Sequence, residues 1–195
     1  SANADTFFNI LNIARDNNIK RVVYASCSSV YGTSTKCPKT EATTGKPLTP
    51  YALSKVINEM YADIFTKCFN MECIGLRYFN VFGPRQPNKG DYISVIPNFI
   101  NKLKNNESPV IYDNGNQNCD FTYITNVVVA TVNALLTQNK HAYGQVINIG
   151  TSSKISVNTL YKTLARVMDK QEITPVYKEK RKEDIQDNVA SINKA

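Results

Sequence analysis

The sequence predicts an α/β fold built on a parallel sheet, and two observations carry this prediction. Apolar residues at helical spacing alternate along the chain with short β-rich runs, and short loops join them. The order of helix, short loop and buried strand is typical of folds whose sheets are parallel. With 195 residues, 42% of them hydrophobic, the chain is long enough for one domain with a substantial core, or for one and a half small ones.

The first helix and strand set this pattern. Asp5 or Thr6 is the expected cap of the helix, and Asn17-Asn18 ends it. A β-rich run follows at residues 21–25, and a small polar cluster at residues 26–29 comes directly after it. The apolar positions of this helix are Phe7, Ile10, Leu11 and Ala14.

A second helix begins at Thr49-Pro50, because a hydroxyl cap followed by proline at the first helical position is a strong start signal. We expect it to end at Phe69 and to be followed by a strand at residues 72–78 and a loop at residues 79–84. Its expected inward positions are Val56, Ile57, Met60, Ile64 and Phe65.

The remainder of the chain alternates in the same way. We expect helices at residues 95–103 and 126–136, and a last helix from the Ser156 cap to Met168. We expect strands at residues 110–112, 146–149 and 175–177, with a turn at residues 113–115.

Composition argues against several classes of protein. No apolar run approaches 18 residues, so we expect no contact with a membrane. The five cysteines form no CxxC pair and there is one histidine, so we expect no metal site. The first residues lack the regions of a signal peptide, and reduced thiols are the plain interpretation of the cysteines, so we expect a cytoplasmic protein.

The net charge of +7 does not by itself indicate nucleic-acid binding. The basic residues are spread along the chain, and the one dense run, residues 178–182, is interrupted by Glu179. A solvated face and a site for an anionic small molecule are both compatible with this run. The chain lacks a basic stripe and an obvious set of stacking aromatics, so we expect no nucleic-acid partner.

Tyr51 and Lys55 form the candidate catalytic pair. One helical turn separates them, so both side chains lie on the same face, where an ammonium can lower the pKa of a phenol. Because free tyrosine titrates near pH 10, a base working near neutrality needs about 4 kcal/mol of differential stabilisation. A cation within about 5 Å in a partly dry site provides much of that. A structural pairing of the two side chains is the alternative.

Several ordered motifs surround this pair, and together they resemble the extended short-chain dehydrogenase/reductases that act on nucleotide-activated sugars. The closest likeness is to bacterial UDP-N-acetylglucosamine 4-epimerases. The motifs are the serine cluster, Tyr-x-x-x-Lys, LRYFNVFGPR at residues 76–85, YDNGNQNCDFTYI at residues 112–124, and TGKPLTPY at residues 44–51. The resemblance covers nearly the whole chain.

The resemblance implies the C-terminal part of a Rossmann-like parallel sheet with a smaller α/β substrate-binding lobe. Residues 1–84, with about 120–150, would be the remaining part of the NAD-binding domain, and residues 85–119 and 151–195 the nucleotide-sugar lobe. The N-terminal glycine-rich βα units that hold the NAD pyrophosphate are absent, since the chain contains no G-x-G-x-x-G. We therefore expect a fragment that is inactive alone.

The resemblance also assigns the catalytic and cofactor-binding residues. Tyr51 would move the proton of the sugar 4-hydroxyl while hydride passes to NAD, and Lys55 would tune Tyr51 and hold the nicotinamide ribose. Tyr78 is assigned to the cofactor with them. Ser28 is the expected catalytic hydroxyl, because the family's usual Ser/Thr position falls on Cys27, a weak hydrogen-bonding residue. Simple packing of a strand end is the alternative for this cluster.

Four further residues are assigned to the substrate. Ser29 belongs to the serine cluster, Asn80 matches a residue that contacts the sugar or diphosphate, and Arg181 matches a diphosphate-binding arginine. Asn188 falls near the position where a bulky residue excludes N-acetylated sugars. Cys119 stands where the family usually has a second diphosphate arginine, which removes one bidentate contact.

The resulting hypothesis is an NAD-dependent 4-epimerase of a UDP-sugar, UDP-GlcNAc/UDP-GalNAc before others. It would act as a homodimer through the first helix and the helix that ends at Phe69. A non-catalytic nucleotide-sugar-binding relative is one alternative, and a 4,6-dehydratase or decarboxylase is another. Dehydratases carry an acidic pair where Ser28-Ser29 stand, so the absence of a carboxylate there favours epimerisation.

Overall fold

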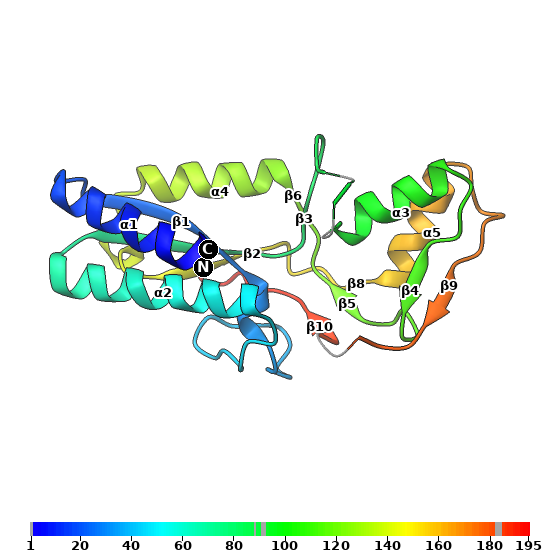
Figure 1. Ribbon diagram of the computed structural model, residues 1–195, viewed down its shortest axis with the longest axis horizontal. Helices are drawn as coiled ribbons and strands as arrows, with labels where there is room; N and C mark the ends of the chain where they lie inside the picture. Colours follow the sequence, from blue (N-terminus) through cyan, green and yellow to red (C-terminus); the bar gives the residue numbers. More distant parts are fainter. Residues whose placement is uncertain (1, 88, 91–92, 182–184) are drawn as a thin grey trace.

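The computed structural model describes residues 2–87, 89–90, 93–181 and 185–195, and its main sheet is parallel, as the sequence predicts (Figure 1). The strands are β1 (Arg21–Cys27), β2 (Glu72–Tyr78) and β7 (Val146–Ile149), in the order β1-β2-β7. Cys27 pairs with Tyr78, and Tyr78 pairs with Ile149. The carboxyl ends of the three strands therefore meet at one edge, where ligand sites of open α/β sheets are found.

Helices cover both faces of this sheet, which explains its apolar strands. Helices α1 (Ala2–Asp16) and α2 (Pro50–Phe69) lie on one face, and α4 (Ile124–Leu136) lies on the other (Figure 1). Because side chains alternate along a strand, Cys73 packs with α1 and α2 while Ile74 packs with α4. Two cores result, one on each face of the same sheet.

The ends of the helices follow their capping residues where those residues are hydroxyls. Thr49 Oγ1 accepts a hydrogen bond from the Ala52 amide at 3.1 Å, so the predicted start of α2 is confirmed. Ser156 caps α5 (Val157–Val167) in the same way. The prediction that Asp5 or Thr6 caps the first helix is wrong, because α1 begins at Ala2 and places Asp5 in its first turn.

The predicted inward face of α2 is also partly wrong. Phe65 is buried, but the Met60 side chain is 61% exposed and Ile64 is 48% exposed. Small and polar residues take the inward positions instead, because α2 packs closely on the sheet and on α1. The buried residues of α2 are Ala52, Ser54, Asn58, Ala62 and Phe65.

A second group of elements lies at the other end of the molecule (Figure 1). Helix α3 (Val95–Lys104) packs on α5 around a core that includes Phe99 and Tyr161. Strands β4 (Val110–Tyr112) and β9 (Val176–Lys178) form a parallel pair beside these helices. The sequence predicts each of these elements to within a few residues.

Short strands connect the two ends of the molecule. They are β3 (Val81–Phe82) with β6 (Thr122–Tyr123), and a three-stranded sheet of β10 (Asp187–Asn188), β5 (Asn118–Cys119) and β8 (Ile155–Ser156). Two 3₁₀ turns complete the described elements, η1 (Ser28–Tyr31) and η2 (Lys140–Ala142).

The buried carboxylate of Asp120 holds these connections together. It accepts hydrogen bonds from the Thr151 amide at 2.8 Å, the Thr151 hydroxyl at 2.6 Å, the Ser152 amide at 2.8 Å and the Ala190 amide at 3.2 Å. Beyond it, Ala190 forms an isolated parallel bridge with Lys39, so the end of the chain returns to the first group of elements. These hydrogen bonds offset the cost of burying the polar oxygens of this side chain.

A buried ion pair fastens α2 to the central strand. Glu59 of α2 accepts two hydrogen bonds from the Arg77 guanidinium of β2, at 2.9 and 2.8 Å. The Ser26 hydroxyl donates to the same carboxylate, and the guanidinium also donates to the Tyr31 hydroxyl at 3.0 Å. Two-point contact of this kind fixes geometry as well as charge.

Two features are absent from the described part of the chain. No helix within residues 2–87, 89–90, 93–181 and 185–195 is both long and apolar enough to span a bilayer. In the same part of the chain, no three side chains of His, Cys, Asp or Glu gather as a metal ligand set.

Candidate active site

Tyr51 and Lys55 lie on the same side of α2, as their spacing predicts. The Lys55 ammonium is 5.7 Å from the centroid of the Tyr51 ring, and it donates a hydrogen bond to the carbonyl of Ala25 at 3.1 Å. Ala25 belongs to β1, so this bond ties the pair to the carboxyl end of that strand. The Tyr51 side chain is 49% exposed, which leaves it accessible to a ligand.

The expected lowering of the Tyr51 pKa is not found. Partial burial of the phenol, followed by the charge of Cys27 and a hydrogen bond with it, raises the pKa of Tyr51 to about 12. The ammonium of Lys55 lies beside the ring and bonds to the backbone, while Cys27 contacts the hydroxyl. In this structure Tyr51 therefore carries its proton at neutral pH.

The serine cluster follows β1 as predicted and forms η1. Cys27 caps this turn, because its sulfur accepts a hydrogen bond from the Ser29 amide at 3.4 Å. Ser28 is 4% exposed, and its hydroxyl oxygen accepts a hydrogen bond from Asn188 at 2.9 Å. The Ser29 hydroxyl is buried and has no hydrogen-bond partner in the described part of the chain.

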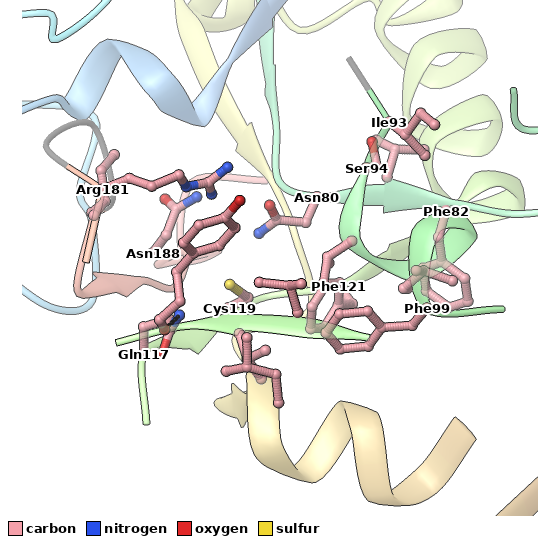
Figure 2. Close-up of a pocket in the computed structure, with 18 of the residues that line it drawn as sticks. Asn80, Phe82, Ile93, Ser94, Phe99, Gln117, Cys119, Phe121, Arg181 and Asn188 are labelled. Carbon is pink, nitrogen blue, oxygen red and sulfur yellow. Dashed lines mark hydrogen bonds between the residues drawn. The ribbon is translucent and has the colours of Figure 1, made fainter. Parts of the chain in front are cut away.

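A cavity of about 390 Å³ opens between the two groups of elements. The predicted substrate residues Asn80, Arg181 and Asn188 all line it, and so does Cys119. Figure 2 shows Arg181 and Asn188 together at one side of this cavity and Phe82 and Phe99 at the other. Its size and mixed polar and apolar lining suit a small organic ligand.

Each of the three predicted residues is held by a specific contact. Asn80 has a positive φ of 28° and donates from Nδ2 to the Asp120 carbonyl at 3.0 Å, so its strained backbone is tied to β5 and β6. The Arg181 guanidinium lies 4.4 Å from the centroid of the Tyr112 ring, a cation–π distance. Asn188 belongs to β10 and bonds to Ser28.

Some predicted residues lie away from this cavity. Among the described lining residues there is neither Tyr51 nor Lys55, and Ser28 and Ser29 are absent from it as well. The Tyr78 hydroxyl forms a hydrogen bond with Thr131 at 2.8 Å, and the ring packs in the core between the sheet and α4. Its assignment to the cofactor stays a prediction.

Tyr112 and Gln117 are two polar residues of the cavity that the sequence did not single out. Gln117 donates from Nε2 to the Tyr112 carbonyl at 3.0 Å. Both lie within the motif at residues 112–124, whose match to the family contained the signal. Spacing alone could not have separated them from the other polar residues of a turn.

Comparison with known proteins shows the family. Residues 1–150 match the model of the NAD dependent epimerase/dehydratase family, and the chain belongs to that family. It is 40% identical over 154 residues to a protein of Methanocaldococcus jannaschii provisionally named as a UDP-glucose 4-epimerase. That match spans 78% of this chain and 48% of the relative, so the chain spans about half the length of this curated relative.

Solved structures agree with the fold. The UDP-N-acetylglucosamine 4-epimerase of Methanobrevibacter ruminantium is 34% identical with a TM-score of 0.91, over 98% of this chain and 60% of that one. The UDP-glucuronic acid 4-epimerase of Bacillus cereus, solved with UDP-glucuronic acid and NAD, is 27% identical with a TM-score of 0.86, over 98% and 59%. The Rossmann-like fold and the NAD dependence of the family are thereby confirmed.

The relatives also include other chemistries. Human dTDP-D-glucose 4,6-dehydratase is 32% identical over 160 residues, covering 82% of this chain and 43% of the relative. A UDP-N-acetyl-α-D-glucosaminuronate decarboxylase of Bacillus cytotoxicus is 34% identical over 166 residues. Membership of the family therefore leaves the reaction to be argued from the residues of this chain.

Proposed function

We propose that this chain carries the catalytic tyrosine and the sugar-binding half of an NAD-dependent UDP-sugar 4-epimerase. The observation that carries the proposal is the arrangement at the strand ends. Tyr51 and Lys55 stand beside the end of β1, and a cavity lined by Asn80, Arg181 and Asn188 opens next to it, joined to η1 by the Asn188–Ser28 bond.

The residues present fit one end of NAD. Lys55 and the half-exposed Tyr51 flank the exposed Ala25 at the end of β1, so an ammonium and a phenol are available to the ribose of the nicotinamide. The bound cofactor supplies the hydride acceptor and donor. The glycine-rich turn that holds the pyrophosphate in this fold is not among these 195 residues.

The proton chemistry belongs to Tyr51. With its pKa raised to about 12, the phenol is protonated and can donate to the oxygen of a 4-keto sugar. Donation leaves a phenolate, whose negative charge the Lys55 ammonium, 5.7 Å from the ring, offsets. In the opposite direction this phenolate takes the proton of the 4-hydroxyl and becomes the neutral phenol again.

The cavity favours a UDP-sugar and epimerisation. Arg181 offers a cation for a diphosphate, and Tyr112 beneath it offers an aromatic face for a base. Among the described lining residues there is no carboxylate, and dehydration needs an acid and a base near C5 and C6. Asn188 is smaller than the bulky residue expected of enzymes that exclude acetamido sugars, so we propose UDP-GlcNAc and UDP-GalNAc as substrates.

A non-catalytic nucleotide-sugar-binding protein is the second candidate. Cys27 and Cys119 stand where the family pattern has a hydroxyl and an arginine, and both changes weaken contacts to the ligand. Turnover separates the two candidates, because both bind UDP-GlcNAc.

We test the proposal by exchange of UDP-GlcNAc and UDP-GalNAc. In an active polypeptide that joins this sequence to a glycine-rich NAD-binding half, Tyr51→Phe should reduce turnover at least roughly 100-fold, since a positioned acid/base is lost. Tyr177→Phe, on the exposed strand β9, is the matched control and should leave the rate within about twofold.

A near-normal rate in Tyr51→Phe would remove Tyr51 from the mechanism. The 195-residue chain alone should show no exchange with added NAD, because the pyrophosphate-binding turn is not part of it. Formation of UDP-GalNAc by the chain alone would contradict this expectation.

We also propose the organisation of the protein. Residues 1–84 with 120–150 would form the NAD-binding part and residues 85–119 with 151–195 the sugar-binding part. The core between α3 and α5, separate from the two cores on the faces of the main sheet, supports this division. Ala190 of the second part packs with Val30, Tyr31 and Phe79 of the first. A homodimer through α1 and α2 is supported by the exposed apolar side chains of Ile13, Met60 and Ile64.

A cytoplasmic location is supported by five cysteines that are all free.

A further inference from the structure

A hydrogen bond joins two predicted site residues that are 160 positions apart. Asn188 Nδ2 donates to the Ser28 hydroxyl oxygen at 2.9 Å. The backbone of Asn188 is fixed on β10, which pairs with β5, and its carbonyl accepts a hydrogen bond from the Asp120 amide at 3.0 Å. Hydrogen bonds therefore hold Asn188 at its backbone and at its side-chain amide.

The two residues differ in their relation to the cavity. Asn188 lines it, next to Arg181 (Figure 2). Ser28 is 4% exposed and is not among the described lining residues. A sugar in the cavity meets Asn188 first, and the buried serine lies behind it.

The bond also sets which end of the Asn188 amide faces Ser28 in this structure. Nδ2 donates to the Ser28 hydroxyl oxygen, so the carbonyl oxygen Oδ1 is the end of the amide that this bond leaves without a partner. Oδ1 is buried and has no partner within the described part of the chain. A buried amide oxygen without a donor is costly, so a site of this kind favours a ligand that supplies an N–H or O–H.

We infer that Ser28 is a positioning residue, which acts on the bound sugar through Asn188 by aiming its Oδ1 at a hydrogen-bond donor of that sugar. This inference rests on the proposed function, because it takes a nucleotide sugar as the occupant of the cavity. The donor is a hydroxyl or the acetamido N–H of the sugar, so UDP without a sugar gains nothing from the pair.

The test compares the affinities of UDP-GlcNAc and UDP for this chain by titration calorimetry. Ser28→Ala and Asn188→Ala should each reduce the advantage of UDP-GlcNAc over UDP by about 3- to 10-fold, the scale of one hydrogen bond. The double variant should lose no more than either single variant, because both changes remove the same contact. Ser28→Thr, which keeps the hydroxyl, should stay within about twofold of the wild type.

Losses that multiply in the double variant would show that Ser28 touches the sugar itself, and would overturn the inference. A Ser28→Thr variant as weak as Ser28→Ala would overturn it as well. The affinity for UDP should stay within about twofold in every variant, which controls for folding.

A second measurement needs no ligand. The side-chain amide signals of Asn188 in a ¹H–¹⁵N spectrum should move in Ser28→Ala and remain nearly in place in Ser28→Thr. Signals that do not respond to Ser28→Ala would overturn the inference. If the wild type binds neither UDP nor UDP-GlcNAc, the proposed function fails, and the amide signals alone decide whether Ser28 positions Asn188.

Discussion

The Cys27 side chain has two roles at the end of β1. Its sulfur caps η1, and it contacts the hydroxyl of Tyr51. A thiol is a weaker hydrogen-bonding group than the serine or threonine of the family pattern. The protonation of the candidate acid/base therefore depends on a residue that is unusual at its position.

Replacement of Cys27 should lower the Tyr51 pKa. Partial burial of the phenol, the largest cause of the raised pKa, remains in Cys27→Ala, but the charge and the hydrogen bond of Cys27 are gone. The pKa should therefore fall from about 12 and stay above the ordinary value near 10. The measurement is a pH titration of tyrosine ¹³Cζ signals, with Cys68→Ala, an exposed cysteine on α2, as the control. An unchanged Tyr51 titration in Cys27→Ala would contradict the assigned cause.

At this scale the sequence predicts spacing better than environment. The shared face of Tyr51 and Lys55 follows from helix geometry alone. The motifs that resemble a family assigned Asn80, Arg181 and Asn188 to the substrate, and all three line one cavity. The direction of the Tyr51 pKa shift could not be predicted, because it is caused by partial burial of the phenol and then by Cys27, and neither follows from helix spacing. The Ser28–Asn188 bond is non-local in the same sense.

Among the elements, α2 depends on more than its own sequence. Thr49 sets its start, but the Glu59–Arg77 pair sets its position on the sheet. Both side chains of the pair are largely buried, at 5% exposure for Arg77 and 12% for Glu59. Such a pair specifies an arrangement more than it stabilises the fold, because each charge has lost its water.

Breaking this pair on one side should destabilise the protein strongly. Arg77→Met leaves the Glu59 carboxylate buried without its cation, and the free energy of unfolding should fall by about 3–5 kcal/mol. The double variant Arg77→Met/Glu59→Leu should recover much of that loss, because no charge is then left buried. Urea unfolding of the variants measures both values, and a double variant as unstable as Arg77→Met would contradict the explanation.

The elements also show why the predicted inward face of α2 is wrong at Met60 and Ile64. The spacing of Val56, Met60 and Ile64 identifies an apolar stripe, but not the surface that covers it. The sheet and α1 take up the stripe that contains Ala62 and Phe65, and they leave Met60 and Ile64 exposed. Exposed apolar side chains such as those of Met60 and Ile64, on one face of a helix, point to association between chains.

For the whole molecule, this exposed stripe predicts the effect of a charge. Met60→Glu should shift a dimer toward monomers, because a carboxylate would have to be buried in the interface. Sedimentation velocity measures the shift. Val167→Glu on α5, a more exposed residue at the other end of the molecule, is the control and should leave association unchanged. A wild-type chain that is monomeric at micromolar concentration would refute the proposed interface.

The tyrosines of the core predict the response of the whole protein to alkali. Burial raises the pKa values of Tyr24 and Tyr31 above that of an unfolded chain, which is about 10. Their contribution to stability is complete below about pH 10 and is lost as the pH rises further, because the unfolded state releases its protons first. The free energy of unfolding should therefore fall between about pH 10 and 12.

Urea unfolding at pH 9 and pH 11 measures this fall. Tyr24→Phe, which keeps the ring and removes the titrating hydroxyl, should make the fall smaller. An equal fall in wild type and Tyr24→Phe would show that Tyr24 does not cause it.

The segment from Ile185 to Ser191 contacts both the cavity and the loop around Lys39. Asn188 of this segment lines the cavity, and the next three residues pair with the loop around Lys39. The Lys39 amide donates a hydrogen bond to the Val189 carbonyl, and the Ser191 amide donates one to the Lys39 carbonyl. The residue that we propose to contact the sugar therefore lies in the same seven-residue segment as the hydrogen bonds to the loop around Lys39. We therefore expect a substitution in this segment that changes the proposed sugar specificity to weaken the hydrogen bonds to the loop around Lys39 as well.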